Sequence, residues 1–210
     1  MIGFLLLLIA PLPWAAEKSV LSQAEQIREE IVVTADRNTQ PLKHTGNSIS
    51  VISKEQIENR GFDFASEAMR QIPGLSVNQS GPIGSATQIR IRGAEANHTL
   101  VLIDGFNAND PAIGSEFNFA DLTTFDVDQI EVVRGSQTAL YGSDTIGGVI
   151  NLITSTPDKT GFSGKAYVAA GNNQSDLYLL NLNGKGERHY VLTNFSKYNT
   201  NGTNASLMGS

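Results

Sequence analysis

The sequence predicts an α+β fold up to residue 157 and a region made of strands alone after it. First, strand-like runs alternate with two short segments of helical spacing between residues 48 and 156. Second, three segments of strand length follow, separated by turns rich in Gly and Asn. Third, 40% hydrophobic and 17% charged residues in a chain of 210 are typical of a folded protein with space for one domain, or for one domain and part of a second.

The first predicted elements are a strand and two short helices. SISVIS (48–53) has the β-branched pattern of a strand. Ser53 and Gln56 match a capping box, which opens a short helix that stops at Gly61. Asp63 is placed to cap the next helix, and Pro73-Gly74 ends it. The residues at helical spacing in this second helix are Ala65, Ala68, Met69 and Ile72.

Four more strands are predicted downstream. TQIRIRG (87–93) alternates strictly, with Ile89 and Ile91 on one face and polar residues on the other. TLVLIDG (99–105) is a buried strand that ends in a turn at Asp104-Gly105. The other two strands are IEVVRG (130–135) and GVINLIT (148–154).

The stretch VVRGSQTALYGSDTIGGVINLIT (132–154) gathers glycines between two strands. A phosphate-binding loop is disfavoured, because Gly148 occupies the position where that motif requires lysine. The alternative is a structural corner. Ser136 caps one helical turn and Gly142 ends it, while Gly147-Gly148 lets the returning strand pass close to another backbone. We predict a structural corner rather than a catalytic loop.

The three final segments, 165–170, 177–183 and 190–198, have strand length, and the second alternates apolar with partly polar positions. Alternating segments of ~10 residues between turns are the signature of a membrane β-barrel. Three strands cannot close a barrel, which takes at least ~8, and an open edge in lipid leaves backbone groups unpaired. The chain is therefore expected to be a fragment or truncation of something longer, unless these strands form a soluble sheet.

The N-terminal residues predict export. Residues 4–10 are a short apolar block followed by prolines and small residues, and the block is shorter than the ~20 residues that span a bilayer. We expect a signal peptide over residues 1–16 and a flexible leader over residues 17–28. The β-branched run Ile31–Thr34 follows, with no evident hairpin partner nearby.

Composition and motifs exclude several classes of function. A net charge of −6 with scattered basic residues argues against a nucleic-acid surface. The absence of cysteine removes thiolate metal sites, thiol nucleophiles and disulfides. The three histidines make no metal-ligand pair, and Asp121, Asp126 and Asp128 fit turn and cap positions better than a calcium loop. No catalytic constellation is present, so we predict a protein that is not an enzyme and needs no metal.

Six motifs in order resemble the plug domain of TonB-dependent outer-membrane receptors. They are IVVTA (31–35), IPGLSV (72–77), IRIRG (89–93), TLVLIDG (99–105), IEVVRG (130–135) and ALYGSDTIGGVINLIT (139–154). Within this family the sequence of these motifs is most similar to that of receptors for vitamin B12 (cobalamin). The resemblance implies a plug over residues 29–157, a small mixed sheet with short helices, followed over residues 158–210 by the first strands of an incomplete transmembrane β-barrel.

The resemblance also implies a function and partners. It implies a Gram-negative outer-membrane receptor that takes up a scarce ligand, here cobalamin, driven by TonB and its inner-membrane complex. A siderophore or haem receptor is the alternative ligand class, and a soluble exported binding module derived from the plug is the alternative architecture. No cofactor is implied.

Three sets of residues carry the family's contacts. Ile31, Val32, Val33, Thr34 and Ala35 match the segment that contacts TonB. Arg92 and Arg134 match plug arginines that pair with barrel glutamates in a buried lock. The outward loops 78–85 and 107–113 are expected to touch the ligand, through the polar residues Asn78, Gln79, Ser80, Ser85, Asn107, Asn109 and Asp110.

Overall fold

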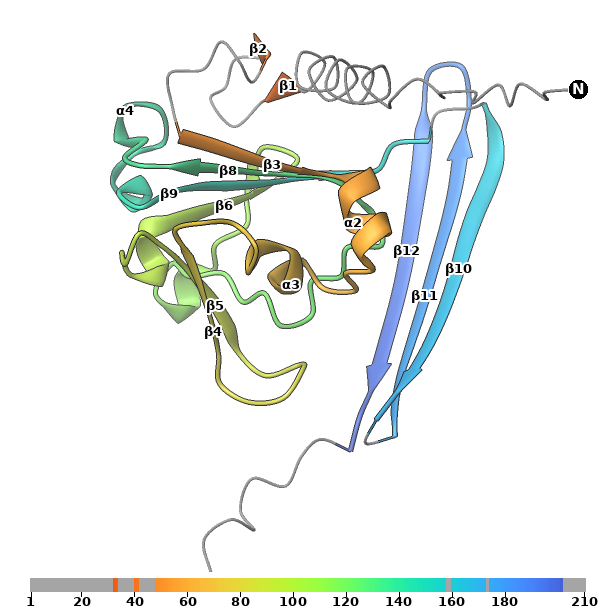
Figure 1. Ribbon diagram of the computed structural model, residues 1–210. Helices are drawn as coiled ribbons and strands as arrows, with labels where there is room; N and C mark the ends of the chain where they lie inside the picture. Colours follow the sequence, from red (N-terminus) through yellow and green to blue (C-terminus); the bar gives the residue numbers. More distant parts are fainter. Residues whose placement is uncertain (1–31, 34–39, 42–47, 158–159, 173, 202–210) are drawn as a thin grey trace, which may run out of the picture.

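The computed structural model describes residues 32–33, 40–41, 48–157, 160–172 and 174–201. The predicted signal peptide (1–16) and leader (17–28) lie outside the described residues. Two bodies are visible in Figure 1: a globular part, residues 48–157, and a sheet of three long strands along one side of it. No helix among the described residues is long and apolar enough to cross a membrane.

The globular part contains the predicted strands and short helices, together with two strands that were not predicted, 75–79 and 106–107. Its strands are β3 (Ser48–Ser53), β4 (Leu75–Gln79), β5 (Thr87–Ile91), β6 (Thr99–Ile103), β7 (Phe106–Asn107), β8 (Val127–Arg134) and β9 (Gly148–Thr154). Its helices are α2 (Lys54–Arg60), α3 (Ala65–Met69) and α4 (Thr138–Tyr141), with short 3₁₀ turns η2 (Ala96–His98), η3 (Pro111–Ile113) and η4 (Ser143–Thr145). Outside this part, β1 (Val32–Val33) pairs with β2 (Gln40–Pro41).

Five strands form a mixed sheet in the order β3-β8-β9-β6-β7. The β6–β9 pair is parallel and the other pairs are antiparallel. Strands β4 and β5 form a separate antiparallel hairpin. The mixed sheet with short helices that the resemblance implied is confirmed.

The main core lies between one face of the sheet and the layer made by α2, α3 and the β4–β5 hairpin (Figure 1). Met69 from α3, Ile89 and Ile91 from β5, and Ile130 and Ile150 from the sheet are all almost completely buried there. The predicted alternation of β5 is confirmed, because its residues are buried at every second position. Burial of these apolar side chains is the main term that stabilises the globular part.

The helix ends test the capping predictions. The Ser53 hydroxyl accepts from the Gln56 N–H at 3.4 Å, the Gln56 side chain accepts from the Ser53 N–H at 3.2 Å, and Gly61 ends α2 in the left-handed conformation. The capping box is thus confirmed. The prediction for Asp63 is wrong, because Glu67 Oε2 from inside α3 accepts from the N–H groups of Asp63 and Phe64, at 3.2 and 3.3 Å.

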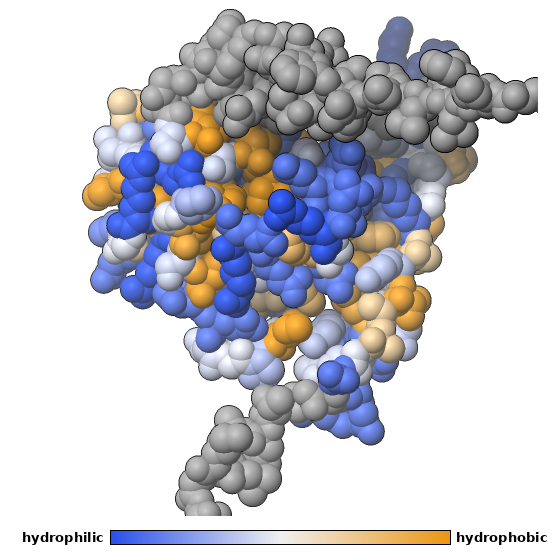
Figure 2. Space-filling model, in the orientation of Figure 1, coloured by the Kyte–Doolittle hydropathy of each residue, from blue (hydrophilic) through white to orange (hydrophobic). Residues whose placement is uncertain are grey.

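The remaining sheet consists of three antiparallel strands in the order β10-β11-β12. They are β10 (Gly161–Gly171), β11 (Ser175–Lys185) and β12 (Tyr190–Asn199). All three predicted segments are strands, and all three are longer than predicted, the third by one residue, because the pairing runs up to the turns. In Figure 2, hydrophobic residues gather at the right of the visible face, over this sheet. Its exposed large apolar side chains are Phe162, Tyr167, Val168, Tyr178, Leu180, Leu182, Tyr190, Val191 and Phe195.

Candidate partner-contacting and ligand-contacting sites

The candidate TonB-contacting segment is described only at Val32 and Val33. These two residues form β1, in which Val32 pairs with Pro41 and Val33 with Gln40. The prediction that the run has no hairpin partner is therefore wrong, since a two-residue partner lies close by in sequence. Ile31, Thr34 and Ala35 lie outside the described residues. In Figure 1, β1 and β2 lie at the end of the molecule where the β11–β12 turn is found.

The two candidate lock arginines come together, although they are far apart in sequence. Arg92 directly follows β5, with φ +52° and its N–H donating to the Gly74 carbonyl at 2.7 Å. Arg134 ends β8, and its Nη1 donates to the Pro73 carbonyl at 2.6 Å and its Nε to the Ser48 hydroxyl at 3.2 Å. Both side-chain stems lie over Gly74, where an added Cβ would be 3.7 Å from Arg134 Cδ and 3.8 Å from Arg92 Cγ.

The electrostatics of this arginine pair are unfavourable within the globular part alone. Partial burial, and then the positive charge of Arg92, lower the pKa of Arg134. Among the described residues, the ion pairs involve other groups, and no carboxylate lies within salt-bridge distance of either guanidinium. The pair is a concentrated positive charge that a carboxylate from outside the described residues would neutralise.

The first candidate ligand loop is the tip of the β4–β5 hairpin, at the end of the molecule opposite β1 and β2 (Figure 1). Asn78 and Ser80 are exposed, and Gln79 accepts from Arg70 Nη2 at 3.0 Å. The Ser85 carbonyl accepts from the Thr87 hydroxyl at 2.8 Å, so part of this loop holds its own turn. Asn78 and Ser80 remain the groups most open to a ligand.

The second candidate loop follows β7 and includes η3. Asn109 has a structural role: its Oδ1 accepts from the Val101 N–H at 2.7 Å, and its Nδ2 donates to the Thr99 and Ser115 carbonyls at 3.0 and 2.8 Å. Asp110 is exposed and caps η3 through the Ala112 N–H at 2.8 Å, and the exposed Asn107 accepts from the Asn109 N–H at 2.9 Å.

One segment that sequence reasoning missed, residues 116–119, joins the second loop to the start of β5, directly after the first loop. Asp110 N–H donates to the Glu116 carbonyl at 2.8 Å, and the Glu116 carboxylate accepts from the Gln88 amide. Asn118 Oδ1 accepts from the Thr87 N–H at 2.9 Å. The segment has neither helical nor strand periodicity, so nothing in the sequence indicated that it would make these contacts.

The glycine corner positions Arg134 at the end of β8 and begins β9. A Cβ at Gly148, which has φ +150°, would lie 2.2 Å from the Val133 carbonyl oxygen, and one at Gly147 would lie 3.0 Å from the His98 carbonyl oxygen. The predicted close approach of two backbones is present. Gly142 has φ +91° and ψ −170°, which is a glycine conformation but not the left-handed helical one.

The predicted cap of the helical turn before Gly142 is wrong. Helix α4 begins after Gln137, which makes no side-chain capping bond. The Ser136 hydroxyl lies 3.2 Å from the Thr138 hydroxyl instead. The turn is held by backbone bonds, such as that from the Tyr141 N–H to the Gln137 carbonyl at 3.0 Å.

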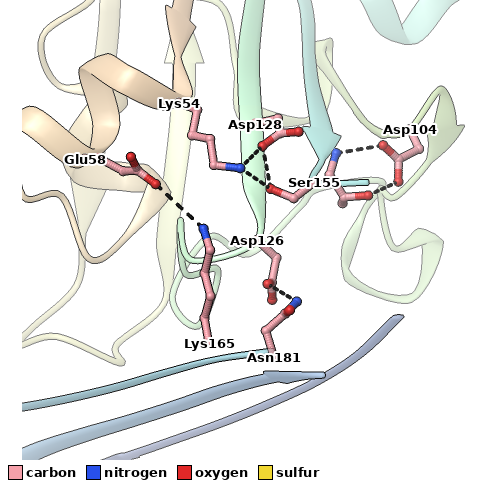
Figure 3. A network of polar contacts seen from close by, with 9 residues as sticks. Lys54, Glu58, Asp104, Asp126, Asp128, Ser155, Lys165 and Asn181 are labelled. Carbon is pink, nitrogen blue, oxygen red and sulfur yellow. Dashed lines mark hydrogen bonds and ion pairs between the residues drawn. The ribbon is translucent and has the colours of Figure 1, made fainter. Parts of the chain in front are cut away.

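A polar network fixes the exit of the chain from β9, and sequence reasoning missed it (Figure 3). The Asp104 carboxylate accepts from the Thr154 N–H at 2.8 Å and from its hydroxyl at 2.7 Å. Ser155 donates its N–H to the Asp126 carbonyl at 2.7 Å and its hydroxyl to Asp128 Oδ1 at 2.5 Å. Lys54 Nζ, 2.5 Å from Asp128 Oδ1, completes the cluster.

Two aspartates in this network carry opposite pKa shifts. Burial raises the pKa of Asp126. Part of this increase is offset by the hydrogen bond from the Asn181 amide and by the charges of Lys165 and Lys54. Burial alone would also raise the pKa of Asp128, but the Lys54 ammonium and the Ser155 hydroxyl outweigh burial and lower it. Asp128 therefore forms an ion pair with Lys54, and Asp126 accepts a hydrogen bond from Asn181; neither serves as the turn or cap residue that was predicted. Within the described part of the chain, no three acidic or histidine side chains gather as a metal site.

Comparison with known proteins identifies the class. The family model of the TonB-dependent receptor plug domain matches residues 41–149, which is more than half of the chain. The chain therefore belongs to the TonB-dependent receptors, and the globular part is their plug. The predicted family, fold class and location in the Gram-negative outer membrane are confirmed, with β10–β12 as strands of the barrel.

Individual relatives of known function and solved structures of the family are similar to this chain. The chain is 37% identical over 176 residues to the vitamin B12 transporter BtuB of Photobacterium profundum, a match that covers 83% of the chain and 28% of that protein. Among solved structures, the ferric enterobactin receptor PfeA of Pseudomonas aeruginosa is 27% identical with a TM-score of 0.58, covering 71% of this chain and 24% of that one. The ferripyoverdine receptor of the same organism shows the shared fold. It is 22% identical with a TM-score of 0.62, and the match covers 75% of this chain and 20% of that one.

These relatives are receptors and transporters rather than enzymes. The chain spans between about a fifth and a third of the length of the proteins it matches.

Proposed function

We propose that this chain is the plug and the first barrel strands of a receptor that takes up cobalamin across the outer membrane, driven by TonB. The observation that carries the proposal is the 37% identity to a vitamin B12 transporter over 83% of the chain. The proposed division is a signal peptide over 1–16, a leader over 17–28, the plug over 29–157 and barrel strands over 158–210. The change from short strands in a mixed sheet to 10- and 11-residue antiparallel strands supports the last boundary.

We assign the contact with TonB to residues 31–35. In this mode of recognition an extended segment joins the edge of a partner's sheet through backbone hydrogen bonds. The β1–β2 pairing supports the assignment, because it consists of only two residue pairs and an isolated hairpin of that size is marginally stable in water. The segment can therefore be transferred from a weak local partner to a longer edge strand.

We assign Arg92 and Arg134 to a lock with carboxylates of the barrel. The support is electrostatic: two arginine side chains lie side by side over Gly74, the charge of one acts on the other, and each described carboxylate lies beyond salt-bridge distance. Charge of one sign concentrated on a docking surface favours a partner of the opposite sign. The plug would then seat with these charges paired.

We assign ligand contact to the exposed polar groups of the two loops, above all Asn78, Ser80, Asn107 and Asp110. Residues 116–119 bond the second loop and the start of β5, which directly follows the first loop; this supports a single presented surface rather than two independent loops. Amide and hydroxyl groups of this kind suit a ligand rimmed by amides, as cobalamin is. Asn109 would act indirectly, by holding the loop shape.

A siderophore receptor is the second candidate. The likeness to the ferric enterobactin receptor, at 27% identity, favours it. The deciding experiment is uptake of radiolabelled cyanocobalamin by cells that express the complete receptor, with and without TonB, and with excess ferric enterobactin as competitor. TonB-dependent uptake that ferric enterobactin leaves unchanged is expected. If the complete receptor bound ferric enterobactin and took up no cyanocobalamin, it would be assigned to the siderophore receptors instead.

A further inference from the structure

The face of β11 that is turned to the plug is buried, and it carries two leucines and one asparagine. Leu177, Leu179 and Asn181 are 4%, 5% and 3% exposed, whereas the alternate residues Tyr178 and Leu180 are 42% and 40% exposed. The interior of a membrane barrel is normally polar and in contact with water. On this side of the barrel, water is replaced by the plug.

The plug residues that cover this face make specific contacts. The rings of Phe64 and Tyr198 meet edge to face with centroids 5.8 Å apart. Asn181 Nδ2 donates to Asp126 Oδ1 of the plug at 2.6 Å (Figure 3). The same amide donates to Asn194 Oδ1 on β12 at 2.6 Å, so both of its hydrogens are used. A buried amide satisfied in this way loses its partners if the plug moves away.

The described residues that lead from the plug toward β10, Thr154 to Pro157, are held as well. Asp104, Asp126 and Asp128 hold Thr154 and Ser155 through the network of Figure 3. From the other body, Lys185 Nζ donates to the Pro157 carbonyl at 2.7 Å. Thr154 and Ser155 are therefore bound by the plug and Pro157 by β11, and these bonds oppose withdrawal of this edge of the plug from β10–β12.

We propose that β10–β12 are a fixed seat: they keep contact with this edge of the plug throughout transport, and the ligand passes at another sector of the barrel. The proposal rests on the proposed function, since it concerns a transport cycle. Separation at the seat would expose Leu177 and Leu179 to water and leave the Asn181 amide without its plug partner. Opening at the seat is therefore unfavourable, because it exposes buried apolar side chains and leaves a buried amide with one partner fewer.

Cross-linking tests the seat directly. The chain has no cysteine, so Asp126→Cys with Asn181→Cys introduces the single thiol pair of this region. A short, reducible bifunctional methanethiosulfonate joins the thiols in the complete receptor. We expect efficient linking, and cyanocobalamin uptake within about threefold of the same receptor after reduction. Failure to link, or a larger loss of uptake that reduction reverses, would overturn the proposal. Phe64→Cys with Tyr198→Cys is the second pair, in case the first does not assemble.

A second measurement does not depend on the identity of the ligand. A single cysteine at Asn181 faces the plug, whereas one at the exposed turn residue Asn172 is the matched control. In living cells, a polar maleimide should label Asn172→Cys rapidly and Asn181→Cys slowly, at the same rate with and without TonB. Faster labelling of Asn181→Cys when TonB is active would refute the seat. A receptor without cysteines that takes up no cyanocobalamin would refute the proposed function instead, and the labelling comparison would still decide the seat.

Discussion

Replacement of Gly148 by alanine should destabilise the plug more than replacement of either neighbouring corner glycine. Gly148 is the first residue of β9, between β8 and β6, and a Cβ there would lie 2.2 Å from the Val133 carbonyl oxygen and 3.0 Å from Ile91 Cδ1. The first atom belongs to the backbone of a central strand. It cannot turn aside as a flexible side chain would, so the strands must separate.

The magnitude follows from two separable effects. The φ of +150° strains any residue with a Cβ, at about 1–3 kcal/mol. Forcing atoms into a packed core adds about 1–3 kcal/mol. Gly142 has φ +91° with open space around it, and Gly147 has a tight contact without positive φ. Gly148→Ala should therefore cost about 2–6 kcal/mol, a large part of the ~5–15 kcal/mol that stabilises a typical domain, while Gly142→Ala and Gly147→Ala should each cost about 1–3 kcal/mol.

Urea unfolding of the purified plug, followed by circular dichroism, measures these differences. With a urea dependence of about 1–3 kcal/mol per molar, a loss of ~4 kcal/mol moves the midpoint by more than about 1 M. The geometry requires that Gly148→Ala lower the urea midpoint more than Gly147→Ala or Gly142→Ala does. A Gly148→Ala plug with the midpoint of the parent protein would refute the reasoning about close backbone approach.

Three further outcomes are expected. Arg92→Ala should leave the free energy of unfolding of the isolated plug unchanged or slightly raise it, because the substitution relieves repulsion with Arg134. In the complete receptor, where the lock is buried, the same substitution should cost about 3–5 kcal/mol of stability. Equal effects in the two proteins would contradict the lock. Asp126→Asn keeps the oxygen that accepts from Asn181 but removes a carboxyl whose pKa burial raises above 3.8. The stabilisation from that carboxyl is complete below its unfolded pKa and is lost as the pH rises through its folded pKa. Calorimetry of the complete receptor should therefore show the variant gaining stability relative to the parent from about pH 4 to pH 7. A relative loss of stability over that range would contradict the assignment. Val33→Pro should abolish energised uptake while ligand binding to cells persists.

Local patterns in the sequence were enough to predict most elements of the plug, although strands β4 and β7 were not among them. The capping box at Ser53, the alternation of Ile89 and Ile91, and the Gly147-Gly148 close approach all depend on residues that are near in sequence or on the conformational range of glycine. These signals are short-range, so one sequence contains them in full. The two wrong caps, Asp63 and Ser136, failed because a competing acceptor from inside the helix or backbone bonds alone satisfied the same N–H groups.

Contacts between distant segments could not be predicted in this way. The network of Lys54, Asp104, Asp126 and Asp128 joins four separate segments around the exit of β9, and its members have no common spacing. The approach of Arg92 to Arg134 depends on where β5 and β8 end in three dimensions. The resemblance singled out these two arginines, but only the fold brings them together over Gly74.

The proline prediction at Val33 separates a coupling role from a structural one. In β1, Val33 is paired with Gln40 in a ladder of two residue pairs, far too short to carry much of the plug's stability. Proline removes the backbone N–H and restricts the preceding residue, so it blocks addition of this strand to a partner's sheet. Val33→Ala keeps the N–H and is the matched control, with a mild effect expected on both readouts. Binding and energised uptake of labelled cyanocobalamin are measured on the same cells. If Val33→Pro lowers binding in parallel with uptake, β1 is part of the plug's own structure, and the contact with TonB must be sought in another segment.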